Sequence, residues 1–462
     1  MSSFERHMSD ADALMWHIEK DPILRSTIVA VGILDRSPDW ARLRERFQRA
    51  SIAIPRFRQR VLSPPMRLGP PRWAYEPDFD LDFHLKRFRL HAPGTRRQLL
   101  DTIAPIAQSS FDRARPLWEC VVIEGLEAGR AAMVMKVHHS VTDGVGGVEL
   151  LTQLVDLERD APERLRDRPA PPPEWFDARG LVRESLAHTT RRWMGIGRRA
   201  PASVASATTA LLRDPLGAIS STTATARSIA RSLAPAGAPL SPIMTQRGMG
   251  RWLDTIDVTL DDLKRAAKAA EGSLNDAFVA GACGGLARYH DRNGARIDHL
   301  RMAMPINLRT DDASTAGNQF APARFPVPIH IEDPIERMQA IRALVLEWRA
   351  EPALRLTSTL AGVLNRLPTQ VTTAIFGGML KCVDFVTSNV PGAPLPVFVA
   401  GAGVERFYAF GPPSGAGVNI TLMSHVDQCC IGVVVDTAAV PDPGVLLSDL
   451  REGFALVIRA SR

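Results

Sequence analysis

The sequence of 462 residues lacks the features that mark disulfide-stapled, zinc-binding and membrane-spanning proteins. Its five cysteines are few and odd in number, and none forms a Cys-x-x-Cys pair, so neither a disulfide framework nor a cysteine zinc site is expected. No run of about 18 uninterrupted apolar residues occurs, and the largely apolar stretch 385–404 is broken by Pro391, Pro394 and Pro396. The first 20 residues mix acidic and basic side chains and contain no basic patch followed by a long apolar run. We therefore expect no membrane-spanning helix, no secretory signal and a cytoplasmic location.

What the sequence does contain is the composition of an ordinary globular protein. Hydrophobic residues make up 45% and charged residues 23% of the chain, and the mean hydropathy is -0.05, which excludes global disorder. At about 100–200 residues per domain, the length predicts two or three domains. The net charge of +6 suits an anionic surface or anionic small molecules such as nucleotide phosphates, and no nucleic-acid partner is expected.

Residues 158–245 differ in composition from the chain on either side. Prolines cluster at both ends of this segment, and Ala, Ser, Thr and Arg dominate between them. The segment is interpreted as a linker between an N-terminal domain, residues 1–157, and a C-terminal domain, residues 246–462.

The linker also holds the positive charge of the chain. From Arg179 to Arg231, nine arginines stand against Glu184 and Asp214, an excess of seven positive charges. Two interpretations stay open. The segment forms a basic amphipathic helix on an anionic bilayer, or it is a solvated linker that packs its few apolar residues on the domains. The apolar residues in question are Leu181, Leu186, Trp193, Met194 and Ile196.

Strand and helix patterns alternate on both sides of the linker. The apolar run 132–137 predicts a buried strand, and apolar residues from Val148 to Val155 at helical spacing predict a following helix. In the second half, 301–308 predicts a strand, Asp333-Pro334 predicts a helix start, and 418–424 with 429–436 predict a hairpin. Both halves are therefore expected to be mixed α/β.

The most informative segment follows the strand 132–137 and contains His138, His139, Asp143 and Gly144. Strand ends are where α/β proteins place reactive groups, and an imidazole can take a proton from a hydroxyl near neutral pH and pass it on. Asp143 can fix the loop, and Gly144 lets the backbone turn tightly and approach a ligand. A metal site and a capped helix start are the alternatives, but the preceding apolar strand and the Asp-Gly pair favour a catalytic loop.

Polar or aromatic residues in several other segments have both a structural and a functional interpretation. Trp118 is interpreted mainly as a packed aromatic residue. Ser273 and Asp276 form a capping box, which leaves Asn275 free to donate a hydrogen bond toward a substrate carbonyl. Ser388 and Asn389 end a strand-like run, where they either line a ligand site or close a turn.

Together these segments resemble the bacterial wax ester synthase/diacylglycerol acyltransferases, which belong to the HHxxxDG acyltransferase superfamily. The heptapeptide 138–144 indicates only the superfamily, and the narrower resemblance depends on five further matches in the same order along nearly the whole chain. These matches are Trp73 with 78–84, Pro116-Leu117-Trp118-Glu119, Asn275-Asp276, 305–309 with Gly317-Asn318, and Ser388-Asn389-Val390-Pro391-Gly392.

The resemblance implies an α/β fold with two chloramphenicol-acetyltransferase-like domains and an active-site tunnel between them. It implies transfer of a long-chain acyl group from acyl-CoA to diacylglycerol or a long-chain alcohol, without a metal or bound cofactor. His139 would be the general base, while His138 would assist orientation and Asp143 would hold the loop. Gly144, Asn275, Ser388 and Asn389 would contact substrate, and a peripheral membrane or lipid-body contact would bring the lipid acceptor.

Two other functions remain open at this point. One is a condensation-type acyltransferase that takes its acyl group from a carrier-protein thioester, and the other is a noncatalytic lipid-binding protein. The intact His139 and Asp143 argue against the second, because a binding role needs no base at a strand end.

Overall fold

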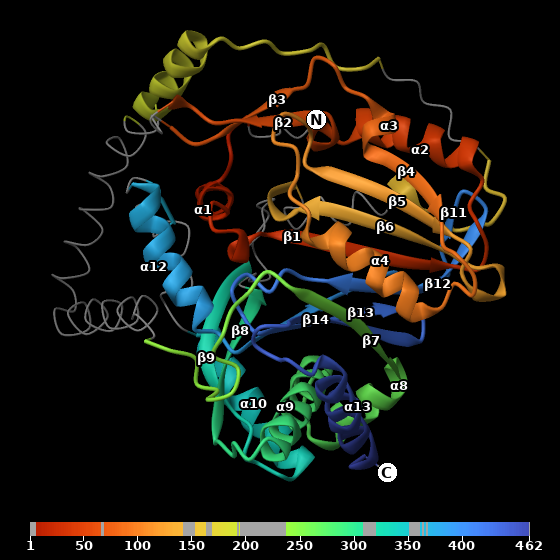
Figure 1. The fold of residues 1–462 in the computed structure, drawn as a ribbon, viewed down its shortest axis with the longest axis vertical. Helices are drawn as coiled ribbons and strands as arrows, with labels where there is room; N and C mark the ends of the chain where they lie inside the picture. Colours follow the sequence, from red (N-terminus) through yellow and green to blue (C-terminus); the bar gives the residue numbers. More distant parts are fainter. Residues whose placement is uncertain are drawn as a thin grey trace, which may run out of the picture.

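The computed structural model describes residues 6–65, 69–141, 153–162, 169–191, 194, 237–307, 320–350, 361–362, 365 and 368–461. Two six-stranded sheets organise this part of the chain, one formed mainly by the N-terminal half and one by the C-terminal half (Figure 1). The mixed α/β fold with two sheets and flanking helices agrees with the sequence-based expectation. The predicted residues Asp143 and Gly144 and most of the predicted helix 148–155 lie outside the described residues.

The first sheet has the strand order β11-β12-β1-β6-β5-β4. Its strands are β1 (Thr27–Leu34), β4 (Leu85–Arg89), β5 (Trp118–Glu124), β6 (Ala131–His138), β11 (Phe398–Val399) and β12 (Ala402–Phe410). Strand β6 pairs antiparallel with β1 and β5, and all eight of its residues are buried. The strand predicted over 132–137 is thus confirmed as a central strand, which explains its nearly unbroken apolar run.

The two faces of the first sheet bury different partners. Met133 and Met135 of β6 face a core formed with α2 (Trp40–Ala53), while Val134 faces a core formed with α4 (Arg96–Gln108). The α4 core also takes in side chains of the second sheet, including Leu253. Alternate residues of one strand therefore hold the N-terminal domain together and join it to the C-terminal half.

The second sheet has the order β7-β14-β13-β10-β8-β9 and is backed by helices α8, α9, α10 and α13 (Figure 1). Their bounds are β7 (Arg251–Thr259), α8 (Leu260–Ala269), α9 (Leu274–Arg292), β8 (His299–Asn307), β9 (Phe320–Pro328), α10 (Pro334–Arg349), β10 (Phe385–Val390), β13 (Val418–His425), β14 (Gln428–Asp436) and α13 (Pro443–Arg459). The predicted β13–β14 hairpin, the strand near 301–308 and the helix start at Asp333 are confirmed. The Ser273–Asp276 capping box is also present, at the start of α9.

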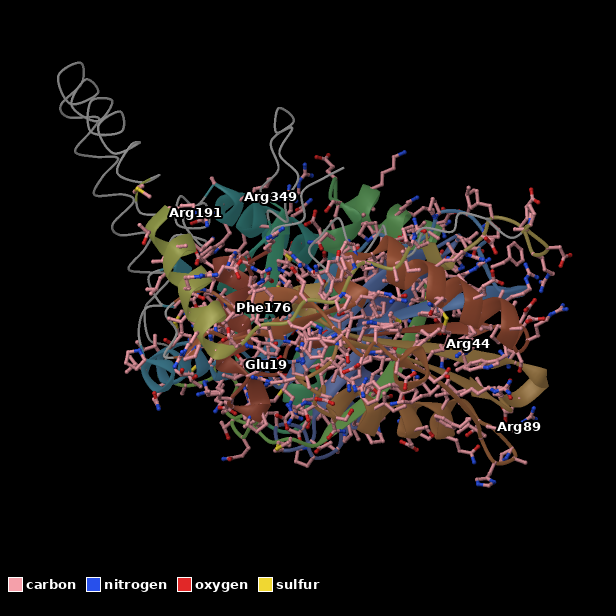
Figure 2. The ribbon with its side chains drawn as sticks, turned by 90° about the horizontal axis from the view of Figure 1, so that it is seen from above. Glu19, Arg44, Arg89, Phe176, Arg191 and Arg349 are labelled. Atoms are coloured by element: carbon pink, nitrogen blue, oxygen red, sulfur yellow. The ribbon has the colours of Figure 1, made fainter. Side chains whose placement is uncertain are left out.

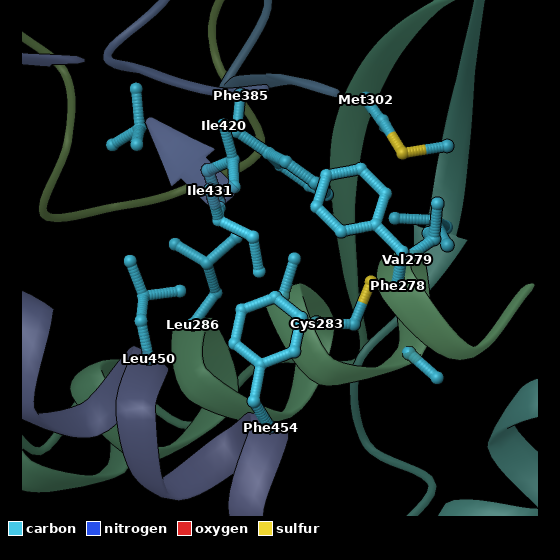
Figure 3. Close-up of a cluster of buried hydrophobic side chains, with 14 of the residues drawn as sticks. Phe278, Val279, Cys283, Leu286, Met302, Phe385, Ile420, Ile431, Leu450 and Phe454 are labelled. Atoms are coloured by element: carbon cyan, nitrogen blue, oxygen red, sulfur yellow. The ribbon is translucent and has the colours of Figure 1, made fainter. Parts of the chain in front are cut away.

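Apolar side chains of the helices and strands form the main core beneath this second sheet (Figure 3). Phe278 of α9 and Phe454 of α13 stack with ring centroids 6.1 Å apart, and both are fully buried. The two helices approach so closely that a Cβ atom on Gly453 would lie 2.4 Å from the Gly281 carbonyl oxygen. Glycine is needed there because any side chain would push the helices apart.

Strands β11 and β12 return from the C-terminal half to the first sheet. Strand β12 pairs antiparallel with β1, with Phe410 opposite Val29 and Gly32 opposite Phe407. The expected boundary at residue 246 therefore does not coincide with the division between the sheets. A boundary drawn from linker composition could not show this, because the pairing joins strands that are far apart in the sequence.

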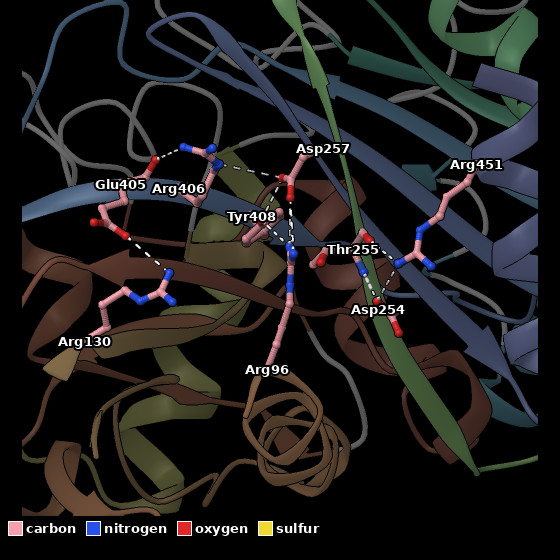
Figure 4. Close-up of polar contacts among 9 residues, drawn as sticks. All are labelled: Arg96, Arg130, Asp254, Thr255, Asp257, Glu405, Arg406, Tyr408 and Arg451. Atoms are coloured by element: carbon pink, nitrogen blue, oxygen red, sulfur yellow. Dashed lines mark hydrogen bonds and ion pairs between the residues drawn. The ribbon is translucent and has the colours of Figure 1, made fainter. Parts of the chain in front are cut away.

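Ion pairs and hydrogen bonds between α4, β7 and β12 join the two sheets (Figure 4). Arg96 of α4 lies 3.1 Å from Asp257 of β7, and Asp257 also accepts a 2.7 Å hydrogen bond from Tyr408 of β12. Next to them, Arg97 and Arg451 both approach Asp254. The domains are thus fixed to each other by polar contacts as well as by the shared core.

The described part of the linker packs back on the N-terminal domain. Arg72 of β3 (Arg72–Tyr75), which is 3% exposed, pairs with Glu174 at 3.1 Å and with Glu184, and its guanidinium lies over the Phe176 ring. Leu181 in the helix 178–191 is buried. This part agrees with a linker that packs on a domain, while Leu186 and Met194 are about half exposed and Trp193 and Ile196 lie outside the described residues.

Shorter elements complete the fold. Helix α1 packs against α12, and Leu14 and Ile18 form a small core with Leu24 and Phe376. The remaining elements are α1 (Asp10–Ile18), η1 (Pro22–Leu24), η2 (Pro55–Phe57), β2 (Gln59–Leu62), α3 (Leu81–His84), η4 (Glu127–Gly129), η5 (His139–Val141) and α12 (Thr369–Lys381). Within the described ranges, none of the helices has the length and apolar character needed to cross a bilayer.

Candidate active site

The histidine pair lies where β6 ends and a short 3₁₀ turn, η5, begins. His138 is the last residue of the strand and stands opposite Thr27, the first residue of β1. The backbone N–H of His139 donates a 2.9 Å hydrogen bond to the carbonyl of Ser26. Pairing with the start of β1 therefore holds the backbone of both histidines, as a catalytic group at a strand end requires.

The side chain of His138 is buried and held at both ring nitrogens. Its Nδ1 atom lies 2.7 Å from the Ser140 hydroxyl and accepts the backbone N–H of Ser140 at 3.2 Å. A backbone N–H can only donate, so Nδ1 is unprotonated and the ring proton is on Nε2. Nε2–H then donates to Oε1 of Glu19 at 2.9 Å. The contacts fix both the tautomer and the orientation of His138.

Glu19 is a site residue that sequence reasoning missed. It follows helix α1 and accepts a second hydrogen bond, from the Ser26 N–H at 2.7 Å, while Arg113 lies 3.6 Å away. Burial would raise the pKa of Glu19, but the hydrogen bonds from His138 and the Ser26 N–H and the charge of Arg113 together lower it below its usual value. Glu19 is therefore ionised at neutral pH. Because Ser26 bonds to both Glu19 and His139, one carboxylate supports both histidines.

No local sequence signal marks Glu19, since 119 residues separate it from His138. Figure 2 places it at the end of the molecule that holds α1 and the linker helix, away from Arg44 and Arg89. Only the tertiary packing of α1 on η5 brings the carboxylate to the histidine.

His139 is partly buried, and its environment keeps it neutral. Desolvation, reinforced by the nearby His138, lowers the pKa of His139 to about 4. The imidazole is therefore unprotonated at pH 7 and can accept a proton from a hydroxyl group. This is the state that a general base must have before the reaction.

The other predicted site residues lie on the second sheet. The Asn275 amide donates to the Met304 sulfur of β8 at 3.6 Å. Ser388 and Asn389 lie in the last half of β10, which runs parallel to β8, and both are at least partly exposed. Because Met302 stands opposite Phe385, Asn275, Ser388 and Asn389 share one end of this sheet. These three residues thus lie towards one end of the second sheet, whereas His138 and His139 lie on the first sheet.

The predicted structural role of Trp118 is confirmed. Its ring is fully buried, stacks on Phe57 and His84, and donates through Nε1 to the Phe57 carbonyl at 2.9 Å. The next residue, Glu119, lies 3.2 Å from the ammonium group of Lys136, which is fully buried two residues before His138 on β6. Burial lowers the pKa of Lys136, and Glu119 acts in the opposite direction. Trp118 therefore packs in the core beside the strand that carries the histidines, and Glu119 balances the charge of Lys136 on that strand.

The mixed α/β fold with two six-stranded sheets is the fold class of the condensation domains and their relatives. The first condensation domain of the calcium-dependent antibiotic synthetase superposes with a TM-score of 0.61 at 15% identity, covering 100% of this chain and 97% of that one. The wax ester synthase/diacylglycerol acyltransferase from Marinobacter aquaeolei VT8 superposes with a TM-score of 0.65 at 22% identity, covering 98% and 99%. Because both sequence identities are below 25%, these superpositions show that the fold is shared.

Sequence comparison gives the particular family. Residues 8–278 match the wax ester synthase/diacylglycerol acyltransferase catalytic domain, and residues 316–457 match the C-terminal domain of the same family. A protein of Mycobacterium tuberculosis H37Rv, named as a candidate diacylglycerol O-acyltransferase, is 40% identical over 447 residues, which cover 97% of this chain and 90% of the relative. The chain belongs to the wax ester synthase/diacylglycerol acyltransferase family and is an acyltransferase, as the sequence motifs predicted.

Proposed function

We propose that this chain transfers a long-chain acyl group from acyl-CoA to the hydroxyl group of a diacylglycerol, or of a long-chain alcohol, with His139 as general base. The observation that carries the proposal is a neutral imidazole at the end of β6, next to a second histidine held by Glu19 and Ser140. The name of the mycobacterial relative supports diacylglycerol as acceptor, and the Marinobacter structure adds the long-chain alcohol through the wax ester product in its name.

The reaction is a single acyl transfer. His139 takes the proton of the acceptor hydroxyl as the oxygen attacks the thioester carbonyl, and a C–O bond forms while the C–S bond breaks. The proton then passes from His139 to the departing CoA thiolate. No covalent acyl-enzyme is needed because the nucleophile belongs to the substrate, and holding donor and acceptor in one site supplies part of the rate gain.

Asp143 and Gly144 keep the proposed roles of holding and shaping the catalytic loop. Asn275, Ser388 and Asn389, which share one end of the second sheet, are proposed to contact substrate from the other side of a tunnel between the domains. The proposal requires no metal or bound cofactor.

A peripheral contact with an anionic membrane or lipid body completes the proposal. Its support is the excess of seven positive charges between Arg179 and Arg231, together with apolar side chains that the described linker exposes, among them Leu186 and Met194. Such a contact would deliver a water-insoluble acceptor to the enzyme.

The experiment is thiol release from palmitoyl-CoA by the purified protein, with dioleoylglycerol and hexadecanol offered separately in anionic or neutral vesicles. We expect release with at least one acceptor and a loss of about 10²–10⁴-fold in His139→Ala, the usual contribution of a general base. Faster release on anionic vesicles supports the membrane contact. Near-normal turnover by a folded His139→Ala variant would refute the mechanism, and turnover only from a carrier-protein thioester would select the condensation-type alternative.

A further inference from the structure

A pocket of about 270 Å³ opens beside His138. Its lining includes the apolar side chains of Trp16, Phe111 and Leu117, together with His138 and Glu19. The pocket thus lies against His138, and its wall suits the uncharged part of a ligand.

The pocket carries an excess of positive charge. Lys20, Arg25 and Arg113 line it, and among the described residues that line it Glu19 is the one acid. Glu19 is engaged by His138 and the Ser26 N–H, and the Arg113 guanidinium lies 4.1 Å over the Trp16 ring. About two positive charges therefore face a small partly enclosed volume, where they attract an anion more strongly than on an open surface.

A second, smaller pocket adjoins the first one. The two share Arg25 and Thr27, and the second reaches the seam between the sheets at Arg251 and Phe410. Arg25 is held in place by a 2.6 Å hydrogen bond from its guanidinium to the Gln108 carbonyl. The two pockets therefore share part of their walls, and together, called here the channel, their lining residues extend from His138 past the start of β1 to the domain seam.

We infer that this channel binds phosphate-ester groups, and that these are the phosphates of the CoA donor. The inference rests on the proposed function and adds the residues that recognise the donor. CoA carries three phosphate groups at the end of an uncharged arm, and Arg and Lys are the side chains that bind phosphate in proteins. Cationic side chains next to apolar ones in a pocket beside His138 match that distribution of charge. An anionic phospholipid headgroup presents the same phosphate chemistry and is the other source to be distinguished.

The test compares two thioester donors that differ in phosphate. Octanoyl-CoA carries phosphates, and octanoyl-N-acetylcysteamine carries none. In Lys20→Gln we expect the KM for octanoyl-CoA to rise at least fivefold with kcat within twofold, and the KM for octanoyl-N-acetylcysteamine to stay unchanged. Lys20→Arg should keep most of the affinity because it keeps the charge.

Two controls make the comparison specific. Arg89→Gln removes one positive charge from β4, where Arg89 is exposed and lies towards the other end of the molecule from Glu19 (Figure 2), and it should change neither KM. Titration of CoA itself against wild type and variants follows donor binding without turnover, so a failure of the proposed reaction is separated from a failure of the channel.

The outcomes are distinct. An equal rise of both KM values would mean that the charges act through Glu19 and His138 on the fold of the site, and it would overturn the inference. If the pocket variant bound CoA as wild type does but bound phosphatidic acid vesicles more weakly, the phosphate recognised by the channel would belong to a lipid headgroup. If the variant bound both CoA and the vesicles as wild type does, the channel would contain no anion-binding site.

Discussion

The buried side chains beneath the second sheet and those at the end of β6 in the first sheet differ in polarity. Beneath the second sheet, α9 and α13 pack through phenylalanine, leucine and glycine, with buried apolar atoms in contact throughout (Figure 3). At the end of β6, by contrast, buried positions hold His138, Lys136 and Ser140, with Glu19 beside them. The first arrangement can only pack, whereas the second holds groups that exchange or bind protons.

The polar region is stable because its buried groups are paired. Lys136 is balanced by Glu119, and His138 is balanced by Glu19 and Ser140. A buried polar group that loses its partner costs about 1–3 kcal/mol, so each pairing is a constraint on the fold as well as on the site. We therefore expect substitutions in the core of the second sheet to change mainly stability, and substitutions at the end of β6 to change mainly activity.

The largest expected effect on folding is in the apolar core. Gly453→Ala should lower the free energy of unfolding by about 3 kcal/mol, because its Cβ would lie 2.4 Å from the Gly281 oxygen and from the Gly285 nitrogen. Both clashing atoms belong to a helix backbone, which cannot move aside as a side chain can. Urea unfolding followed by circular dichroism measures the change.

Gly444→Ala is the matched control on the same helix, since nothing lies within 4 Å of the position that its added methyl group would occupy. Alanine is the better helix former by about 1 kcal/mol, so this variant should be neutral or slightly more stable. Equal stability of the two variants would show that α9 and α13 are not in close contact. The turnover per folded molecule should stay near wild type in both, because neither residue lies near the histidines in the fold.

The next largest effect concerns the polar region. Glu19→Ala should reduce kcat by about 10–100-fold with little change in KM, because it removes the group that orients His138 and, through Ser26, supports the backbone of His139. The free energy of unfolding should fall by only about 1–3 kcal/mol, the cost of an unpaired buried donor.

Glu19→Gln sharpens this prediction. The amide oxygen can still accept from His138 or Ser26, so we expect a kcat between those of Glu19→Ala and wild type. Glu45→Gln removes a carboxylate from an exposed pair with Arg49 on α2 and should leave kcat unchanged. If Glu19→Ala lost stability but kept the wild-type kcat, the carboxylate would be structural only.

How far the sequence predicts the molecule differs between the two regions. Local patterns predicted β6, the β13–β14 hairpin and the cap at Asp333, because periodicity and capping are short-range properties. The histidine pair was found because it directly follows an apolar strand. Glu19 and the return of β12 to the first sheet were missed, since each depends on a contact between distant segments that no local pattern encodes.

The smallest expected effect is a pH dependence of stability in the first-sheet core. His84 is fully buried and stacked on Trp118, its Nδ1–H donates to the Trp118 carbonyl at 2.7 Å, and desolvation lowers its pKa to about 4. Between pH 6.5 and pH 4 the unfolded chain binds a proton at this histidine and the folded protein does not. Lowering the pH therefore favours unfolding, by about 1 kcal/mol for each unit within that window.

His84→Gln isolates this contribution. The glutamine amide can still donate to the Trp118 carbonyl but does not titrate, so the loss of stability between pH 6.5 and pH 5.5 should be about 1 kcal/mol smaller than in wild type. Urea unfolding at the two pH values gives the difference, and comparing slopes cancels the cost of the substitution itself. Identical slopes would mean that His84 takes up its proton in the folded protein as readily as in the unfolded chain. The buried core around Trp118 would then carry an additional charge at low pH.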